Sequence, residues 1–122
     1  MIRMQRLITA ESAKRMAAMR ATARASDPIV VVKLFTPFGG WTWLLTEYNP
    51  KTEIAVGFAY CNSHPDDAEL GRIDVGELQA LRTPWGGQSV ERDSWFTEKP
   101  ISEAIAKECQ GARSIYPRAV NT

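Results

Sequence analysis

The sequence predicts an α+β fold, with a small antiparallel sheet of three to five strands, a basic N-terminal helix and two short C-terminal helices. Three observations support this fold. The run 30–48 places two β-prone segments on either side of a short turn that contains proline and glycine. Before that run, residues suited to packing recur at helical spacing. After it, polar residues that favour helix N-termini precede two short apolar segments.

The first element is a helix expected over residues 10–25, where repeated alanine favours helical backbone. Thr9 precedes it as an N-cap candidate. A capping box would need Glu or Gln three residues later, but Ser12 stands there, so Thr9 is expected to cap alone. The helix ends at Asp27 and Pro28, because proline disfavours helical backbone in the residue before it. The stripe expected to face the sheet is Ser12, Met16, Met19 and Ala23.

A three-stranded meander follows the helix. Its strands are expected at 29–36, 41–48 and 54–60. Gly39 and Gly40 tolerate the positive φ that a chain reversal requires, and the polar run 49–52 supplies the second turn. Because side chains alternate along a strand, Trp41 and Trp43 are expected to share one face. Two tryptophans in an apolar strand are typical of a core, although an open face used for binding is the alternative.

The region after the meander is predicted to begin with a loop over 61–69 and a short strand over 70–73. Asp74 then caps a helix that begins near Val75, with Glu77 at the capping-box position. Two leucines of this helix are expected to face inward, namely Leu78 and Leu81.

The C-terminal third is predicted to hold one irregular strand and one helix. Residues 84–87 end the preceding helix, and 89–96 form an irregular or edge strand in which Trp95 and Phe96 are buried anchors. Ser102 is expected to cap the last helix, over 103–109.

A length of 122 residues fits one domain with its own core. We expect a single domain over 1–122. Its parts are a basic helical arm over 1–26, a β-meander over 29–60, a mixed strand and helix region over 61–110 and a tail over 111–122. No internal repeat is present in the sequence.

Composition predicts a cytoplasmic globular protein. Hydrophobic residues make up 44% of the chain and charged residues 24%, which argues against disorder. No apolar run approaches the roughly 20 residues that would cross a bilayer, so no membrane association is expected. Cys61 and Cys109 are far apart and outside any CxxC pattern, and His64 is the only histidine. We therefore predict no disulfide, no metal and no cofactor.

Charge is divided unevenly along the sequence. Residues 1–26 contain six basic residues and one acidic residue, whereas the remainder contains nine basic and thirteen acidic residues. Such a basic helix folds back on an acidic body, or it contacts a phosphate backbone or an acidic partner. An exposed, solvated helix face explains the same pattern. The arginines proposed to contact a macromolecule are Arg15, Arg20 and Arg24.

Several uncommon segments in fixed order carry a resemblance to a known family. They are KLFTPFGGWTWLLTEYNP, ELGRIDVGELQALR, VERD and PISE, and the resemblance around them covers roughly residues 7–103. In these segments the chain resembles a small bacterial family catalogued as domain of unknown function 2958. The resemblance implies an intact fold and a setting on plasmids, integrative elements or phage-like islands. It implies no activity. The chain departs from the family pattern at Leu44, Leu45 and Arg72.

Motifs for catalysis are weak in this sequence. Strand-end carboxylates are candidates for acid–base chemistry or a hard cation, but caps or surface salt bridges explain them more simply. They are Glu47, Glu69, Asp74, Glu91 and Asp93. The acidic loop 64–69 lacks the ligand spacing of an EF-hand. Neither cysteine has a recognisable activating neighbour, and no GxSxG motif occurs.

The sequence therefore favours a non-enzymatic interaction module of a mobile element, which binds a protein through Trp85 and the basic helix. Trp85 lies between Pro84 and Gly86, so it is the tryptophan most expected to be exposed. Modulation of a host defence complex is one concrete form of this function. A nucleic-acid-binding accessory protein that uses the basic helix is the first alternative, and a small enzyme that uses strand-end carboxylates is the second. Oligomeric state and the partner's identity are left open.

Overall fold

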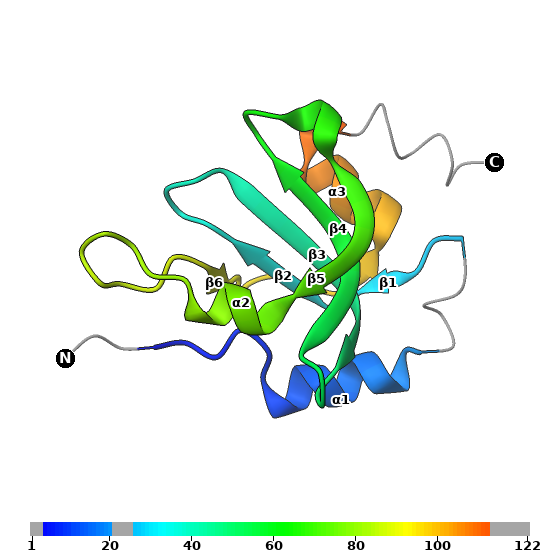
Figure 1. The fold of residues 1–122 in the computed structure, drawn as a ribbon. Helices are drawn as coiled ribbons and strands as arrows, with labels where there is room; N and C mark the ends of the chain where they lie inside the picture. Colours follow the sequence, from blue (N-terminus) through cyan, green and yellow to red (C-terminus); the bar gives the residue numbers. More distant parts are fainter. Residues whose placement is uncertain (1–3, 21–25, 113–122) are drawn as a thin grey trace.

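The computed structural model describes residues 4–20 and 26–112, and this part of the chain forms the predicted α+β fold (Figure 1). The helices are α1 (Ala10–Ala18), α2 (Val75–Ala80) and α3 (Ile101–Glu108), with short 3₁₀ turns at Pro65–Asp67 and Gln110–Ala112. The strands are β1 (Ile29–Val30), β2 (Val32–Phe35), β3 (Trp41–Asn49), β4 (Ile54–Cys61), β5 (Glu69–Asp74), β6 (Glu91–Arg92) and β7 (Lys99–Pro100). None of the helices in these ranges has the length and apolar character needed to cross a membrane.

Five strands form one antiparallel sheet in the order β5-β4-β3-β2-β6. The predicted meander is thus confirmed, and β5 and β6 extend it on either side. The first predicted strand is divided at Val31, because β2 pairs with β3 whereas β1 pairs with β7 in a separate two-stranded sheet. β3 bulges between Leu45 and Glu47, where the buried Thr46 donates its hydroxyl to the carbonyl of Val56 at 3.2 Å.

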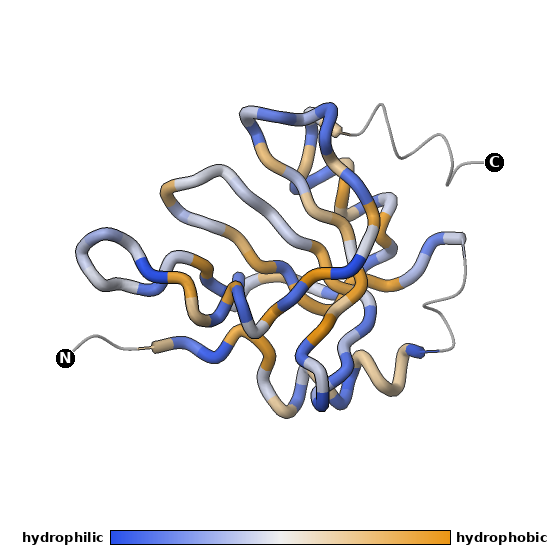
Figure 2. Tube along the Cα trace, viewed as in Figure 1, coloured by the Kyte–Doolittle hydropathy of each residue, from blue (hydrophilic) through white to orange (hydrophobic). Residues whose placement is uncertain are grey.

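Each face of the sheet carries its own core cluster, and successive β3 residues contribute to opposite clusters. Trp43 and Leu45 belong to the cluster beneath α1, α2 and the N-terminal segment. Leu44 belongs to the cluster beneath α3. Figure 2 shows that hydrophobic segments concentrate where the strands meet, while most turns are hydrophilic or intermediate and the β2–β3 turn is hydrophobic at its tip. The sheet is therefore covered by helix on both sides.

The N-cap of α1 is more complete than expected. Thr9 caps the helix as predicted, accepting a hydrogen bond from the Ser12 amide at 3.0 Å. The prediction that Thr9 acts alone is wrong, because the Ser12 hydroxyl accepts from the Thr9 amide at 2.9 Å and completes a capping box. Met16 is the buried residue of α1. The helix ends at Ala18, and the end of the predicted helix at 21–25 lies outside the described residues.

Two predictions about burial in the second half are wrong. Asp74 caps α2 as expected, accepting from the Glu77 amide at 3.1 Å, and Leu78 packs against the core. Leu81, however, is the residue after the helix and is half exposed. Trp95 is 92% exposed rather than an anchor, and it lies in a turn where its amide donates to the Asp93 carboxylate at 2.9 Å. Phe96 does pack against the α3 cluster.

The last helix begins earlier than expected and is capped from elsewhere in the chain. α3 starts at Ile101, so Ser102 lies inside the helix and is not its N-cap. Asp27 takes over the capping role: its carboxylate accepts from the Ser102 amide at 2.9 Å and from the Ser102 hydroxyl at 2.7 Å. The predicted tail lies outside the described residues after Ala112.

Candidate interaction surfaces

Exposed aromatic side chains gather where the β2–β3 turn meets the loop after α2. The rings of Phe38 and Trp85 contact each other edge to face, with centroids 5.7 Å apart. Phe38 is 81% exposed and Trp85 is 67% exposed. Trp41, at the start of β3, is 42% exposed. We call Phe38, Trp41 and Trp85 the aromatic end. The predicted exposure of Trp85 is confirmed.

The loop that carries Trp85 is held by its own hydrogen bonds. The amide of Thr83 donates to the carbonyl of Gly87 at 2.8 Å, and the amide of Gly86 donates back to the carbonyl of Thr83 at 2.9 Å. The hydroxyl of Thr83 accepts from the Gly87 amide at 2.9 Å. Gly86 adopts φ 90°, which a residue with a side chain rarely tolerates. Trp85 is thus presented on a closed, ordered turn.

The β2–β3 turn is ordered in the same way. Thr36 donates its amide to the carbonyl of Trp41 at 3.0 Å and accepts from the Trp41 amide through its hydroxyl at 2.9 Å. Trp41 stacks on Trp43, with centroids 5.6 Å apart and planes inclined by 11°. Trp43 is only 9% exposed and belongs to the core. Of the two tryptophans whose burial the sequence left open, Trp43 therefore belongs to the core and Trp41 lies over it at the surface.

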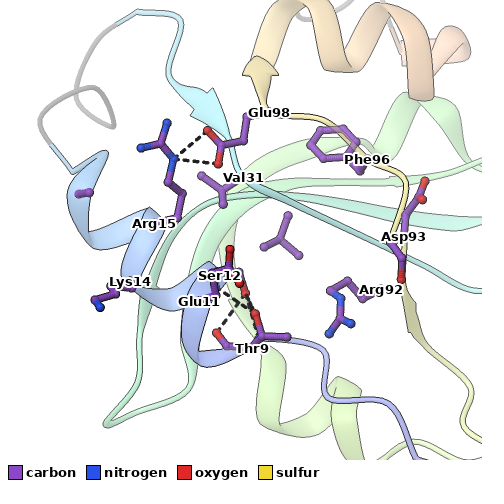
Figure 3. Close-up of a pocket in the computed structure, with 13 residues that line it drawn as sticks. Thr9, Glu11, Ser12, Lys14, Arg15, Val31, Arg92, Asp93, Phe96 and Glu98 are labelled. Carbon is purple, nitrogen blue, oxygen red and sulfur yellow. Dashed lines mark hydrogen bonds and ion pairs between the residues drawn. The ribbon is translucent and has the colours of Figure 1, made fainter.

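A first groove, of about 740 Å³, runs between α1 and the segment that joins β6 to β7 (Figure 3). Val31 and Phe96 contribute apolar surface to it. Arg15 crosses towards Glu98, and its Nε lies 3.0 and 2.9 Å from the two carboxylate oxygens. This hydrogen bond and the charge of Glu98 raise the pKa of Arg15 above its usual value. The guanidinium is thus already paired within the chain.

Charges around the first groove are balanced. Three basic and three acidic residues line it, namely Lys14, Arg15, Arg92, Glu11, Asp93 and Glu98. Two of them are held by other contacts, because Arg92 donates to the carbonyl of Arg6 and Asp93 pairs with Lys33 at 3.3 Å. The groove therefore has little net attraction for a charged ligand.

A second groove, of about 750 Å³, lies between the C-terminal end of α1 and the turn that joins β3 to β4. Arg20, Lys51 and Arg72 line it, and Glu47 is the one carboxylate among its lining residues. Tyr48 lies at its wall, where burial, followed by the charge of Glu53, raises the pKa of the phenol. Unlike the first groove, this one has an excess of basic side chains.

The predicted site residues are therefore dispersed. Arg15 lines the first groove, Arg20 lines the second, and Trp85 lines neither. Arg24 lies outside the described residues. Phe38 is part of the aromatic end but cannot be identified from the sequence, since nothing local distinguishes an exposed phenylalanine in a turn from a buried one.

The candidate carboxylates do not converge either. Asp93 pairs with Lys33 at 3.3 Å, Asp74 caps α2 and Glu47 lines the second groove. Within 4–20 and 26–112, no group of three or more His, Cys, Asp or Glu side chains is placed to hold a metal ion.

The prediction that neither cysteine has an activating neighbour is wrong for Cys61. Its Sγ lies 3.2 Å from the Ser63 hydroxyl, which in turn lies 3.2 Å from Nδ1 of His64. The hydrogen bond with Ser63, assisted by His64, lowers the pKa of Cys61. Cys109 behaves oppositely, because burial raises the pKa of its thiol to about 12. Cys61, Ser63 and His64 stand within the four-residue segment CNSH, so the sequence places them close together. No known motif with this spacing identifies an activated cysteine, however, so the sequence alone does not predict the lowered pKa.

Comparison with known proteins identifies the family. The family model described as "Protein of unknown function (DUF2958)" matches residues 7–116. No curated protein and no solved structure is significantly similar to the chain. Because the family match covers most of the sequence, the chain belongs to the DUF2958 family.

Proposed function

We propose that this member of the DUF2958 family is a non-enzymatic interaction module that binds a protein partner through its aromatic end. The observation that supports the proposal is the edge-to-face pair of Phe38 and Trp85, two large aromatic rings that remain mostly exposed. Exposed apolar side chains that touch one another from separate segments are typical of interaction sites, whereas single exposed apolar residues are common on any surface.

Preorganisation strengthens this proposal. Both turns that carry the rings are closed by hydrogen bonds, through Thr36 in one and Thr83 in the other. Binding then costs little conformational entropy for these segments, so more of the burial energy of the rings contributes to affinity. Trp is also among the residue types that dominate measured binding energies at protein interfaces. The complementary partner surface is an apolar pocket that admits the Trp85 indole.

The biological setting is part of the proposal. The resemblance to a family carried on plasmids, integrative elements and phage-like islands favours a module encoded by a mobile element and acting in the bacterial cytoplasm as one domain. A host protein or a second element-encoded protein would be the partner, and a host defence complex is the concrete case. Arg15 contributes little to this surface, because Glu98 already binds its guanidinium.

Capture from a native host, followed by affinity measurement, tests the proposal. The full chain with an affinity tag is used to isolate partners, and the dissociation constant of a purified partner is then measured. Trp85→Ala and Phe38→Ala are each expected to weaken binding by about tenfold or more, the loss typical of an interface hot spot. Both rings are exposed, so thermal stability should change little.

Trp95→Ala is the matched control. Trp95 is even more exposed than Trp85, but its ring contacts no other aromatic ring in the described part of the chain. It should bind the partner as the unaltered chain does. If Trp95→Ala weakens binding as much as Trp85→Ala, or if neither aromatic-end variant weakens it, the aromatic end is not the interface.

A further inference from the structure

We propose that the second groove binds the phosphate backbone of a single-stranded nucleic acid. This inference goes beyond the proposed protein interaction, since the groove and the aromatic end share no residue. Three elements meet at the groove. Arg20 follows α1, Lys51 lies in the β3–β4 turn and Arg72 lies in β5.

The three basic side chains form no ion pair within the part of the chain that the structure describes. In residues 4–20 and 26–112 the ion pairs are those of Arg15 with Glu98 and of Lys33 with Asp93 and Glu108. Arg20, Lys51 and Arg72 are exposed, and none of them lies within 4 Å of a carboxylate oxygen of the described residues. Like charges gathered in a concave surface attract a polyanion, because each phosphate contact also releases condensed counterions.

The charge excess is specific to this groove. The first groove has a similar volume, but its three basic residues are matched by three acidic ones. In the second groove, Glu47 is the one lining carboxylate against three cations, and the charge of Glu53 also acts on Tyr48 at the groove wall. The C-terminal end of α1 carries a partial negative charge that disfavours anions, but this effect is limited to the last turn of the helix. Lys51 and Arg72 belong to other elements, so it does not weaken their attraction for phosphate. The basic excess is thus a property of the fold, which joins residues distant in sequence.

The groove favours a single strand over a duplex. It is concave, and Tyr48, Pro50 and Val56 add ring and aliphatic surface beside the cations. In a single strand the bases are free to unstack and rest on such surface while the backbone contacts the cations. A duplex keeps its bases paired inside and offers mainly phosphates on a convex rod, which does not use the apolar wall.

Fluorescence polarisation with a labelled single-stranded oligonucleotide tests the inference on the full chain. Binding should be measurable at low salt, with a log–log salt slope of about −2 for three phosphate contacts. Lys51→Ala and Arg72→Ala should each weaken binding and reduce the steepness of this slope by about 0.7. Both residues are exposed, so these variants should fold normally, which circular dichroism checks.

Lys14→Ala is the matched control, because Lys14 is an exposed lysine that lines the balanced first groove. The Lys14→Ala variant should bind the oligonucleotide with an unchanged salt dependence. Trp85→Ala should do the same, so that loss of the protein interface can be distinguished from loss of nucleic-acid binding. Absence of binding at low salt, equal losses for Lys14→Ala and Lys51→Ala, or tighter binding of the matching duplex would each overturn the inference. Tighter binding of polyglutamate than of the oligonucleotide would overturn it in favour of an acidic protein.

Discussion

Gly57 of β4 lies directly opposite Gly71 of β5, yet only Gly57 is sterically confined. A Cβ at Gly57 would collide with the carbonyl oxygen of Leu44 and would lie 3.0 Å from the Cα of Leu45. A Cβ at Gly71 would meet nothing within 4 Å. The bulge of β3 begins at Leu45, so β3 approaches β4 closely beside Gly57. Gly57 is therefore the position that allows the two central strands to pair across the bulge.

Gly57→Ala is expected to lower the free energy of unfolding by about 3 kcal/mol, because backbone atoms cannot move aside as a flexible side chain would. Denaturant titration measures the change. Gly71→Ala is the matched control and should change stability by less than about 0.5 kcal/mol. Both substitutions reduce the conformational freedom of the unfolded chain equally, so that contribution cancels in the comparison. If Gly57→Ala and Gly71→Ala had equal stability, β3 would not approach β4 closely beside Gly57.

The largely buried Lys33 joins three elements by ion pairs. Its Nζ lies 2.6 Å from Glu108 in α3 and 3.3 Å from Asp93 after β6. Desolvation alone would lower the pKa of Lys33, but the hydrogen bonds and charges of Glu108 and Asp93 outweigh it and raise the pKa. Lys33→Met would leave two carboxylates facing each other in a partly buried site. We expect a loss of about 2 kcal/mol in the free energy of unfolding.

The pH dependence of this loss follows from the raised pKa of Lys33. The stabilisation is complete below the unfolded lysine value of 10.5 and disappears as pH rises through the higher folded value. The difference between the parent chain and Lys33→Met should therefore shrink at strongly alkaline pH. Lys107→Met, at an exposed position of α3, is the control and should be nearly neutral. A loss for Lys33→Met no larger than that of the control would show that the ion pairs contribute nothing.

Asp27 fixes the start of α3 from a distant part of the sequence. Its carboxylate accepts two hydrogen bonds from Ser102, one of them from a backbone amide at the helix N-terminus. Asp27→Ala should therefore cost about 1 to 2 kcal/mol, the range measured for lost N-caps. Asp27→Asn retains one acceptor oxygen and should recover part of this loss. Thermal or denaturant unfolding distinguishes the variants. Equal losses for both would mean that the charge of Asp27 matters and the cap does not.

Elements that depend on neighbouring residues were predictable from the sequence. Gly39 and Gly40 marked the first turn, and Asp74 marked the start of α2, because in each case the residues that stabilise the conformation are a few positions apart. The sequence indicates Thr9 as a cap, but the Ser12 hydroxyl takes the place of the longer side chain that a capping box usually has. Local chemistry thus fixed most strand and helix positions.

Features that depend on distant residues were not predictable. Asp27 and Ser102 are 75 positions apart, so no local pattern shows that one caps the other. The apolar side chain of Trp95 favours burial, but burial depends on whether the fold places another element over it, and Trp95 is exposed.

The candidate sites were only partly predictable for the same reason. Trp85 was predictable as exposed because proline and glycine flank it, whereas its contact with Phe38 joins segments 47 positions apart. The basic residues of the N-terminal segment suggested one continuous binding helix. In the structure Glu98 binds Arg15, and Arg20 instead joins Lys51 and Arg72. Charge counted along the sequence cannot show which cations are neutralised by residues far away.

The two cysteines are expected to react with iodoacetamide over different pH ranges. Because hydrogen bonds with Ser63 and His64 lower the pKa of Cys61, its thiolate forms at lower pH than that of a free thiol. Cys109, with a pKa of about 12 and 0% exposure against 5% for Cys61, should stay unmodified until the chain unfolds. Mass spectrometry of alkylated peptides across a pH series measures both rates. Ser63→Ala should move the Cys61 profile to higher pH without affecting Cys109, and an unchanged profile would show that the Ser63 hydroxyl does not stabilise the thiolate.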